Sequence, residues 1–374
     1  MVNSNKLNMK TNNERLLSID TLRGFDMFWI IGWGGIWHGL AKLTDWQLFN
    51  WWSTQMTHCK WDGFHFYDFI FPLFIFIAGI SFPFSLEKSQ QKGVPKRTLY
   101  FKIFKRALIL ALLGLVYNGF LKFDFNPKYF ISVLGRIGLA WMFAALIFIN
   151  TKRYGRIIWC AGILVIYWLA LVLIQAPDYP EASRLSPEGN ISCYLERTFL
   201  PEKMIIPTHR ISGFIPAIAT ALLGMMTGAF VKSTKDSLTQ MRKVIYMTVA
   251  GVGLVALALL WDIILPINKP LWSSSYVCLA GGLSLLLFVL FYWIIDVRGY
   301  RRWTLFFKVI GLNSITIYMA QSIINFRFTT NFIFGGVVKL FPESWEQFLN
   351  NITLITVCWF FLYFLYKKKI FLKV

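Results

Sequence analysis

Charged residues are scarce in this chain of 374 residues. Asp, Glu, Lys and Arg together make up 15% of it, whereas 56% of the residues are hydrophobic. Soluble globular proteins carry about a quarter charged residues, so the composition excludes that class, and the apolar excess excludes a disordered chain. Cysteine is also scarce: the five cysteines show no CxxC or metal-type spacing, which indicates neither a disulfide framework nor a structural metal.

Acidic residues are few as well, 18 against 38 Lys and Arg, which gives a formal charge of +20. In a soluble chain this excess would suggest nucleic acid as a partner. Here the basic residues form short clusters between apolar runs, and no zinc-finger, RNA-binding or helix-turn-helix pattern is present. We therefore attribute the charge to membrane topology and expect no nucleic-acid partner.

Long apolar runs take the place of charge. Roughly 20 apolar residues in a helix cross a bilayer core of about 30 Å. We expect an all-α polytopic membrane protein that forms a single domain over residues 1–374, with about ten transmembrane helices and a lipid bilayer as partner. The expected spans are Phe25–Leu43, Phe66–Leu86, Phe104–Phe120, Phe130–Asn150, Ile157–Gln175, Ile211–Val231, Val244–Leu265, Trp272–Ile295, Trp303–Ile324 and Ile352–Tyr366.

A further apolar stretch, Phe326–Leu340, is short and is interrupted by Arg327, Gly335 and Gly336. It is expected to be an interfacial helix, with a short eleventh span as the alternative.

The basic residues set the orientation, because cytoplasmic loops are enriched in Lys and Arg. With both termini in the cytoplasm, the cytoplasmic segments hold 26 of them and the outer loops 11. We expect residues 1–24 to be a cytoplasmic segment, and residues 44–65 and 176–210 to be outer loops. The polar start of the chain predicts no cleavable signal peptide.

Polar residues inside or beside membrane spans are costly, so they are the first candidates for function. They are Asp20, Arg23, Asp26, His58, Asp62, His65, Asp68, Arg136, His209, Arg210, Asp262, Asn313 and Ser314.

The densest group runs from His58 to Asp68 and holds two histidines and two carboxylates. A neutral histidine accepts a proton, and a carboxylate orients its ring. In a helix, His58 and Asp62 would share a face, although Gly63 argues against helix. An aromatic and polar belt at the headgroup level remains an alternative. A metal held by His58, Asp62 and His65 has no supporting motif, so no metal is expected.

Several motifs together resemble one known family. They are Arg15-Leu-Leu-Ser-Ile-Asp20-Thr-Leu-Arg23-Gly24, His58-x-x-Trp61-Asp62-Gly63 followed by Asp68 and Phe71-Pro72, Leu134-Gly-Arg136, Ile267-Asn268-Lys269-Pro-Leu-Trp272, and Gly311-Leu-Asn313-Ser314. This set is similar to the heparan-α-glucosaminide N-acetyltransferase family of transmembrane acyltransferases, and it covers nearly the whole chain.

The resemblance implies that an acetyl group passes from cytoplasmic acetyl-CoA to a glucosamine-type amine on the outer side of the membrane. His58 takes the place of the family's proposed active-site histidine, as general base or as acetyl carrier. The implied catalytic residues are His58, Asp62 and Asp68, the acetyl-CoA-binding residues are Asp20, Arg23, Arg136, Asn313 and Ser314, and the substrate-binding residues are Trp61, Asn268, Lys269, Trp272 and His209.

Two of these assignments have structural alternatives. Arg136 either binds phosphate or pairs with a carboxylate in the bundle. Asn313 and Ser314 either donate hydrogen bonds to reacting oxygens or link helices.

The sequence departs from the family pattern at three places. Asp62 replaces an Asn and adds a negative charge near His58, Gly32 replaces an Asn in the first span, and Pro207-Thr-His209-Arg210 replaces Asp-Pro-Glu-Gly. A relative that has lost catalysis therefore stays an alternative, as does a transporter or flippase for a polar glycan.

The resemblance to bacterial relatives implies an inner-membrane protein with the His58 loop in the periplasm, and a homodimer fits the family. The acceptor would be a glycosaminoglycan fragment, a cell-envelope glycan or a small amino sugar. The acidic residues of loop 176–210 favour a cationic amine over a sulfated polyanion. Cys59 and Cys193, both expected outside, would pair in an oxidising compartment.

Overall fold

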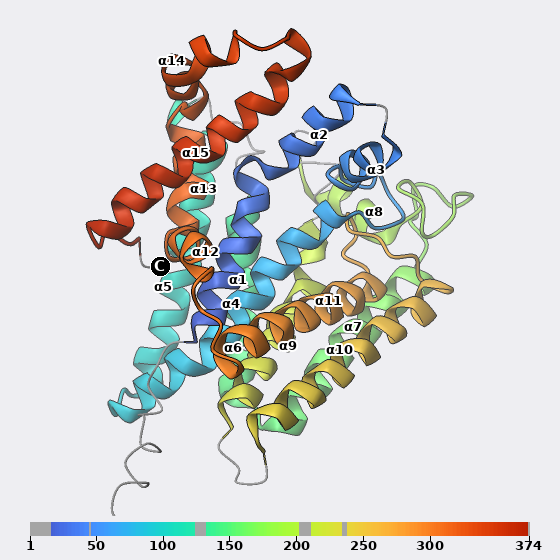
Figure 1. Cartoon of the computed structure of the whole chain (residues 1–374). Coiled ribbons are helices and arrows are strands. Elements are labelled where there is room, and N and C mark those ends of the chain that lie inside the picture. Colours follow the sequence, from blue (N-terminus) through green and yellow to red (C-terminus); the bar gives the residue numbers. More distant parts are fainter. Residues whose placement is uncertain (1–15, 45, 124–131, 202–210, 234–237, 373–374) are drawn as a thin grey trace, which may run out of the picture.

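Most of the chain that the structure describes is helical (Figure 1). The computed structural model describes residues 16–44, 46–123, 132–201, 211–233 and 238–372. Within these ranges there is no strand beyond two isolated β-bridges. The all-α prediction is confirmed.

The helices follow one another with short connections. They are α1 (Leu17–Phe28), the π-helix η1 (Trp29–Trp33), α2 (Gly34–Leu43), α3 (Gln47–Gln55), α4 (Phe66–Gln91), α5 (Lys96–Asn118), η2 (Phe120–Lys122), α6 (Val133–Asn150), α7 (Arg153–Leu173), α8 (Ile191–Phe199), η5 (Ile211–Gly213), α9 (Phe214–Lys232), α10 (Gln240–Asp262), α11 (Ser274–Tyr292), η6 (Trp293–Val297), α12 (Thr304–Leu312), α13 (Ser314–Ile323), α14 (Phe326–Val338), η7 (Glu343–Trp345) and α15 (Glu346–Lys367).

Seven helical segments in the described ranges are long and apolar enough to cross a membrane, those of α4, α6, α7, α9, α10, α11 with η6, and η7 with α15. The chain is therefore a multi-pass integral membrane protein. The remaining three expected spans also fall on helices: α1 with α2, α5, and α12 with α13. The first is interrupted by η1 and the last ends and restarts at Asn313. The count of ten stays a prediction.

The stretch after α13 forms α14, a helix of 13 residues that packs on α15. Since a bilayer crossing takes roughly 20 residues, α14 is too short to span. This agrees with the expected interfacial helix.

The core lies where α4 meets α6, α9 and α11. Close approach of α4 and α9 depends on Gly224, where a Cβ would collide with the backbone carbonyl of Phe76. Small residues at such crossings let helix backbones pack closely in membranes. This packing fixes α4, the helix that carries Asp68 in its first turn.

The helical segment of α1 and α2 is kinked at Gly32, whose φ of +155° lies in a region that L side chains rarely adopt. The π-helix at this point leaves the carbonyl of Ile31 to accept a hydrogen bond of 3.0 Å from the Gln321 side chain on α13. The departure at Gly32 noted in the sequence thus coincides with a backbone kink that a glycine accommodates.

Candidate active site

The His58 loop is an irregular segment between α3 and α4. Helix α4 begins only at Phe66, and Asp68 in its first turn accepts backbone hydrogen bonds from Cys59 (3.2 Å) and His65 (3.1 Å). The loop is thus wrapped around the Asp68 carboxylate. This segment is not helical, as Gly63 indicated, so His58 and Asp62 do not share a helical face, and the partner of His58 is Asp68.

A second loop, between α10 and α11, is joined to the first one. Asp62 forms a β-bridge with Asn268 and accepts a hydrogen bond of 3.1 Å from its side chain, while Gly63 N–H donates to the Ile267 carbonyl at 2.8 Å. These contacts place Lys269 beside His58, although 211 positions separate them in sequence. Asp62 and Asn268 thus align the two loops.

His58, Asp68 and Lys269 form a compact cluster. His58 Nδ1 lies 2.8 Å from Asp68 Oδ1, and Lys269 Nζ lies 3.1 Å from the same oxygen and 2.9 Å from His58 Nδ1. The Asp68 side chain is fully buried and that of Lys269 is 7% exposed, whereas 35% of the His58 side chain is exposed. Tyr276 supports the helix end by donating to the Asp68 backbone carbonyl at 2.7 Å.

The charges of the cluster determine what His58 does. Burial lowers the pKa of the Lys269 ammonium, and the adjacent Asp68 carboxylate opposes this shift. The negative charge of Asp68 and the positive charge of Lys269 cancel, so the groups beside His58 carry no net charge. When Nδ1 donates to Asp68, the lone pair of Nε2 is left to accept a proton or an acyl group.

A cavity of about 280 Å³ opens next to this cluster. His58 and Lys269 form its polar end, Ser314 lines it from the first turn of α13, and its remaining wall is largely apolar. Such a chamber, with a few polar groups at one end, suits a molecule with an apolar arm and a polar reacting group.

Three tyrosines of the cavity wall were not singled out from the sequence: Tyr67, Tyr117 and Tyr318. The rings of Tyr117 and Tyr318 stack with centroids 4.3 Å apart, and the Tyr67 ring lies 4.9 Å from that of His58. Aromatic residues are abundant throughout this chain, so no local pattern marks these three.

Arg136, Trp272 and Trp61 surround the site without lining the cavity. The Arg136 guanidinium lies 5.6 Å from the ring centroid of the fully buried Trp272. The buried Glu196 interacts electrostatically with this guanidinium. The Trp61 indole donates to the carbonyl of Leu185 at 2.9 Å, which joins the His58 loop to loop 176–210.

The expected acetyl-CoA residues separate into groups. Asn313 and Ser314 are buried at the start of α13, and Ser314 is on the cavity wall. Asp20 and Arg23 lie on α1, N-terminal to Met27, the residue of this helix that lines the cavity. Arg23 donates a hydrogen bond of 3.1 Å to Ser81 and lies 3.6 Å from Asp20. His209 is outside the described residues.

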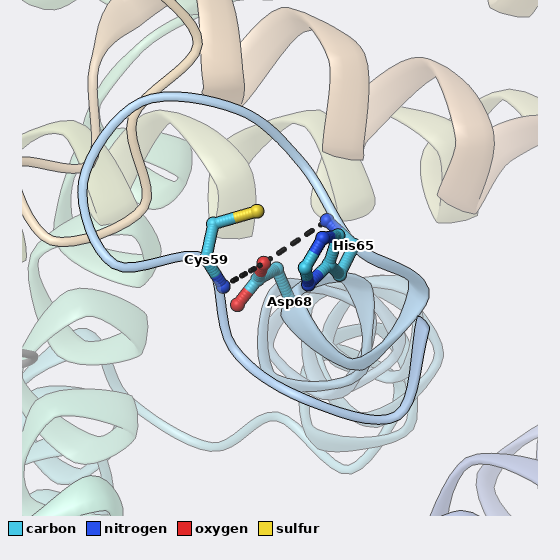
Figure 2. A group of neighbouring side chains, drawn as sticks. All are labelled: Cys59, His65 and Asp68. Atoms are coloured by element: carbon cyan, nitrogen blue, oxygen red, sulfur yellow. Dashed lines mark hydrogen bonds between the residues drawn. The ribbon is translucent and has the colours of Figure 1, made fainter. Parts of the chain in front are cut away.

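One group of metal-ligating type occurs in the described part of the chain, Cys59, His65 and Asp68, with potential ligand atoms within 4.8 Å of one another (Figure 2). It differs from the trio weighed above. The backbone hydrogen bonds to Asp68 drawn in Figure 2, together with His58 and the Lys269 cation, already occupy the carboxylate. Burial raises the pKa of the Cys59 thiol to about 11. We assign the group a hydrogen-bonding role.

Two expectations about loop 176–210 change. Cys59 and Cys193 are not joined by a disulfide, and Cys193 is buried, so the suggested bridge is absent. Asp178 is neutralised by Arg197, with hydrogen bonds of 2.8 and 2.9 Å that lower the pKa of Asp178. Glu196 is buried. The acidic residues of the loop are therefore a weaker argument for a cationic acceptor than their number suggests.

Comparison with known proteins agrees with the motifs. Two curated relatives, both heparan-alpha-glucosaminide N-acetyltransferases, are 26% (Homo sapiens) and 24% (Mus musculus) identical, over 96% and 98% of this chain. The chain spans about 60% of the length of these relatives. A family model described as heparan-alpha-glucosaminide N-acetyltransferase, catalytic, matches residues 15–260, and the chain belongs to that family.

Proposed function

We propose that the protein is a transmembrane acetyltransferase that moves an acetyl group from cytoplasmic acetyl-CoA to the amine of a glucosamine-type sugar on the outer side of the membrane. The observation that supports this most is the position of His58. It lines the inner cavity while about a third of its side chain remains exposed, so it can meet a donor in the cavity and an acceptor outside it.

In the direct reaction, the amine nitrogen attacks the thioester carbonyl carbon. The carbon–nitrogen bond forms as an amine proton moves to His58 Nε2. The carbon–sulfur bond then breaks, and the CoA thiolate takes that proton. Lys269, at the same end of the cavity, is the cation available to the developing oxyanion.

In the two-step reaction, His58 Nε2 itself attacks the thioester carbonyl carbon. The CoA thiolate departs, and His58 is left as an acetyl-imidazolium. The amine then displaces the imidazole, and its proton neutralises the thiolate. Asp68 serves both routes, because it fixes the ring through Nδ1 and stabilises its positive form.

The donor would enter from the end of α1 that carries Asp20 and Arg23. Arg23 is one helical turn from Met27, which lines the cavity. The CoA phosphates would then lie near Arg23 while the pantetheine arm reaches toward His58. This orientation corresponds to cytoplasmic termini and a periplasmic His58 loop in a bacterial inner membrane.

The test is acetyl transfer by purified protein from acetyl-labelled acetyl-CoA to glucosamine. We expect His58→Ala to lower transfer about 100- to 10,000-fold while acetyl-CoA binding persists. His65→Ala is the matched control, because the His65 ring binds the Thr57 carbonyl at 3.0 Å and does not line the cavity. Wild-type protein that binds no acetyl-CoA would refute the proposal in favour of a transporter or a non-catalytic relative.

Label on His58 in the absence of acceptor, found by peptide mass spectrometry, would assign the two-step route. Its absence in protein that transfers acetyl would assign the direct one.

A further inference from the structure

A polar groove runs between α14, α15 and the helices next to them. It consists of two adjoining cavities of about 520 and 400 Å³, both lined by Gly35, Arg327, Asn351 and Leu354. Helices α2, α13, α14 and α15 supply its walls, and α2, α14 and α15 lie toward the upper end of the molecule in Figure 1. We call it the amide groove after its amide side chains Gln321, Asn325, Asn331, Gln347, Asn350 and Asn351.

Arg327 gives the amide groove its charge. It lines both cavities and is exposed, and within the described ranges its guanidinium makes no ion pair and donates no hydrogen bond. The described lining of the two cavities includes no Asp or Glu. A guanidinium presents paired donors that fit two oxygens of a phosphate, so the groove is suited to an anion of that kind.

Apolar side chains border the groove along α13 and α14. Ile323 and Ile324 line the larger cavity and are exposed. Phe328 and Phe332 follow Arg327 on α14, and Phe332 is 83% exposed. In a multi-pass membrane protein, exposed apolar side chains of this size are those that meet lipid chains. The guanidinium therefore stands where a polar groove adjoins a surface suited to lipid.

The two sides of α14 differ in the way that a helix at the membrane surface requires. One side faces the groove with Arg327, Thr330 and Asn331. The opposite side carries the exposed apolar residues of the helix, which are Phe328, Phe332, Ile333 and Val337. A short amphipathic helix of this kind lies in the interface, with its apolar side at the acyl chains and its cation at the level of the headgroups.

We infer that the amide groove binds the headgroup of an anionic phospholipid, with the phosphate on Arg327 and the acyl chains along the apolar side of α14. The amides suit the hydroxyl groups of a glycerol headgroup, because they both donate and accept hydrogen bonds. No acidic side chain in the described lining is present to pair with the ammonium of a zwitterionic headgroup. A lipid held in this way joins α14 to α2, α13 and α15 and stabilises their arrangement.

The test is a competition between two lipids. Delipidated protein is mixed with micelles that hold equal amounts of phosphatidylglycerol and phosphatidylcholine, and native mass spectrometry measures the ratio of the two bound lipids. We expect wild type to favour phosphatidylglycerol about 10- to 100-fold, the effect of charge-assisted hydrogen bonds. Arg327→Gln should lose this preference and Arg327→Lys should keep part of it. Lys339→Gln is the matched control, because Lys339 is an exposed cation at the end of α14 that lines neither cavity.

Two further measurements separate the headgroup from the chains. Phosphatidylglycerol should raise the thermal unfolding midpoint of wild type more than that of Arg327→Gln, because a ligand of the folded state stabilises it. Phe332→Ser should weaken the binding of both lipids and leave their ratio unchanged. Undiminished binding by Phe332→Ser would show that the chains do not lie along α14.

Equal binding of the two lipids by wild type would overturn the inference, and this result does not depend on any variant that fails to fold. An unchanged lipid ratio in Arg327→Gln would overturn it as well. So would displacement of phosphatidylglycerol by an equal concentration of soluble glycerol phosphate, because the groove would then be a site for a free anion. None of these results depends on acetyl transfer, so the proposed function is tested separately.

Discussion

The buried pair of Asp68 and Lys269 allows a quantitative prediction. Their charged atoms are 3.1 Å apart, and both side chains are almost fully buried. At an effective dielectric constant of about 20, the attraction is roughly 5 kcal/mol. Desolvation offsets much of this gain, so the intact pair contributes little net stability, but loss of one partner leaves the other charge uncompensated at a cost of about 3–5 kcal/mol.

We therefore expect Lys269→Met to destabilise the fold by about 3 kcal/mol. This is the lower end of the range, because Asp68 keeps its contacts with His58 and two backbone N–H groups. Asp68→Asn should also destabilise, by stranding Lys269. The double variant should lose less than the sum of the two, with a coupling of about 1–3 kcal/mol.

The assay is denaturant unfolding of wild type, the two single variants and the double variant in one mild detergent, monitored by intrinsic tryptophan fluorescence. The unfolding free energies are compared only if they depend on denaturant concentration with the same slope in all four proteins. Strictly additive losses would refute the assignment of a coupled pair. So would a Lys269→Met protein within about 0.5 kcal/mol of wild type, which is the size of an ordinary surface substitution.

Three smaller perturbations test other parts of the structure. Gly32→Ala should lower the thermal unfolding midpoint, because a φ of +155° in a non-glycine residue is strained by about 1–3 kcal/mol; an unchanged midpoint would contradict the kink. Gly224→Ala should destabilise by about 1–3 kcal/mol through the clash with α4, whereas Gly253→Ala, with open space around it, should be at least as stable as wild type in the same melt. Below the Cys59 pKa of about 11, the thiolate fraction should rise about tenfold per pH unit. Alkylation of Cys59 by iodoacetamide, followed by mass spectrometry, should therefore be slow at pH 8 and its rate should keep rising up to about pH 11. A rate that levels off near pH 9 would show an ordinary thiol instead.

The helices were largely predictable from the sequence, because each apolar run carries its own signal. The expected span Phe130–Asn150 ends where α6 ends, and the expected span Phe66–Leu86 begins where α4 begins. The kink at Gly32 was not predictable, since a glycine in an apolar run has the same hydropathy whether or not the helix continues. The break at Asn313 escaped prediction for the same reason.

The site was predictable only in part. The motif around His58 identified the histidine, and Asp68 was among the candidates. The pairing of His58 with Asp68 depends on where α4 begins, because Asp68 lies in the first turn of that helix. Lys269 was named through the family resemblance as a substrate-binding residue. Its contact with His58 arises from the bridge between Asp62 and Asn268, a long-range pairing that no local pattern encodes.

That bridge also sets the order in which the protein becomes competent during synthesis. The His58 loop leaves the ribosome early, but its Lys269 partner follows α10, so the cluster is incomplete until most of the chain has been made. Until then, Asp68 lacks its Lys269 cation. A nascent chain arrested before the end of α10 is thus expected to insert its early helices and yet expose a loosely held His58 loop. Proteolytic sensitivity of that loop would therefore report how far assembly of the membrane domain has advanced.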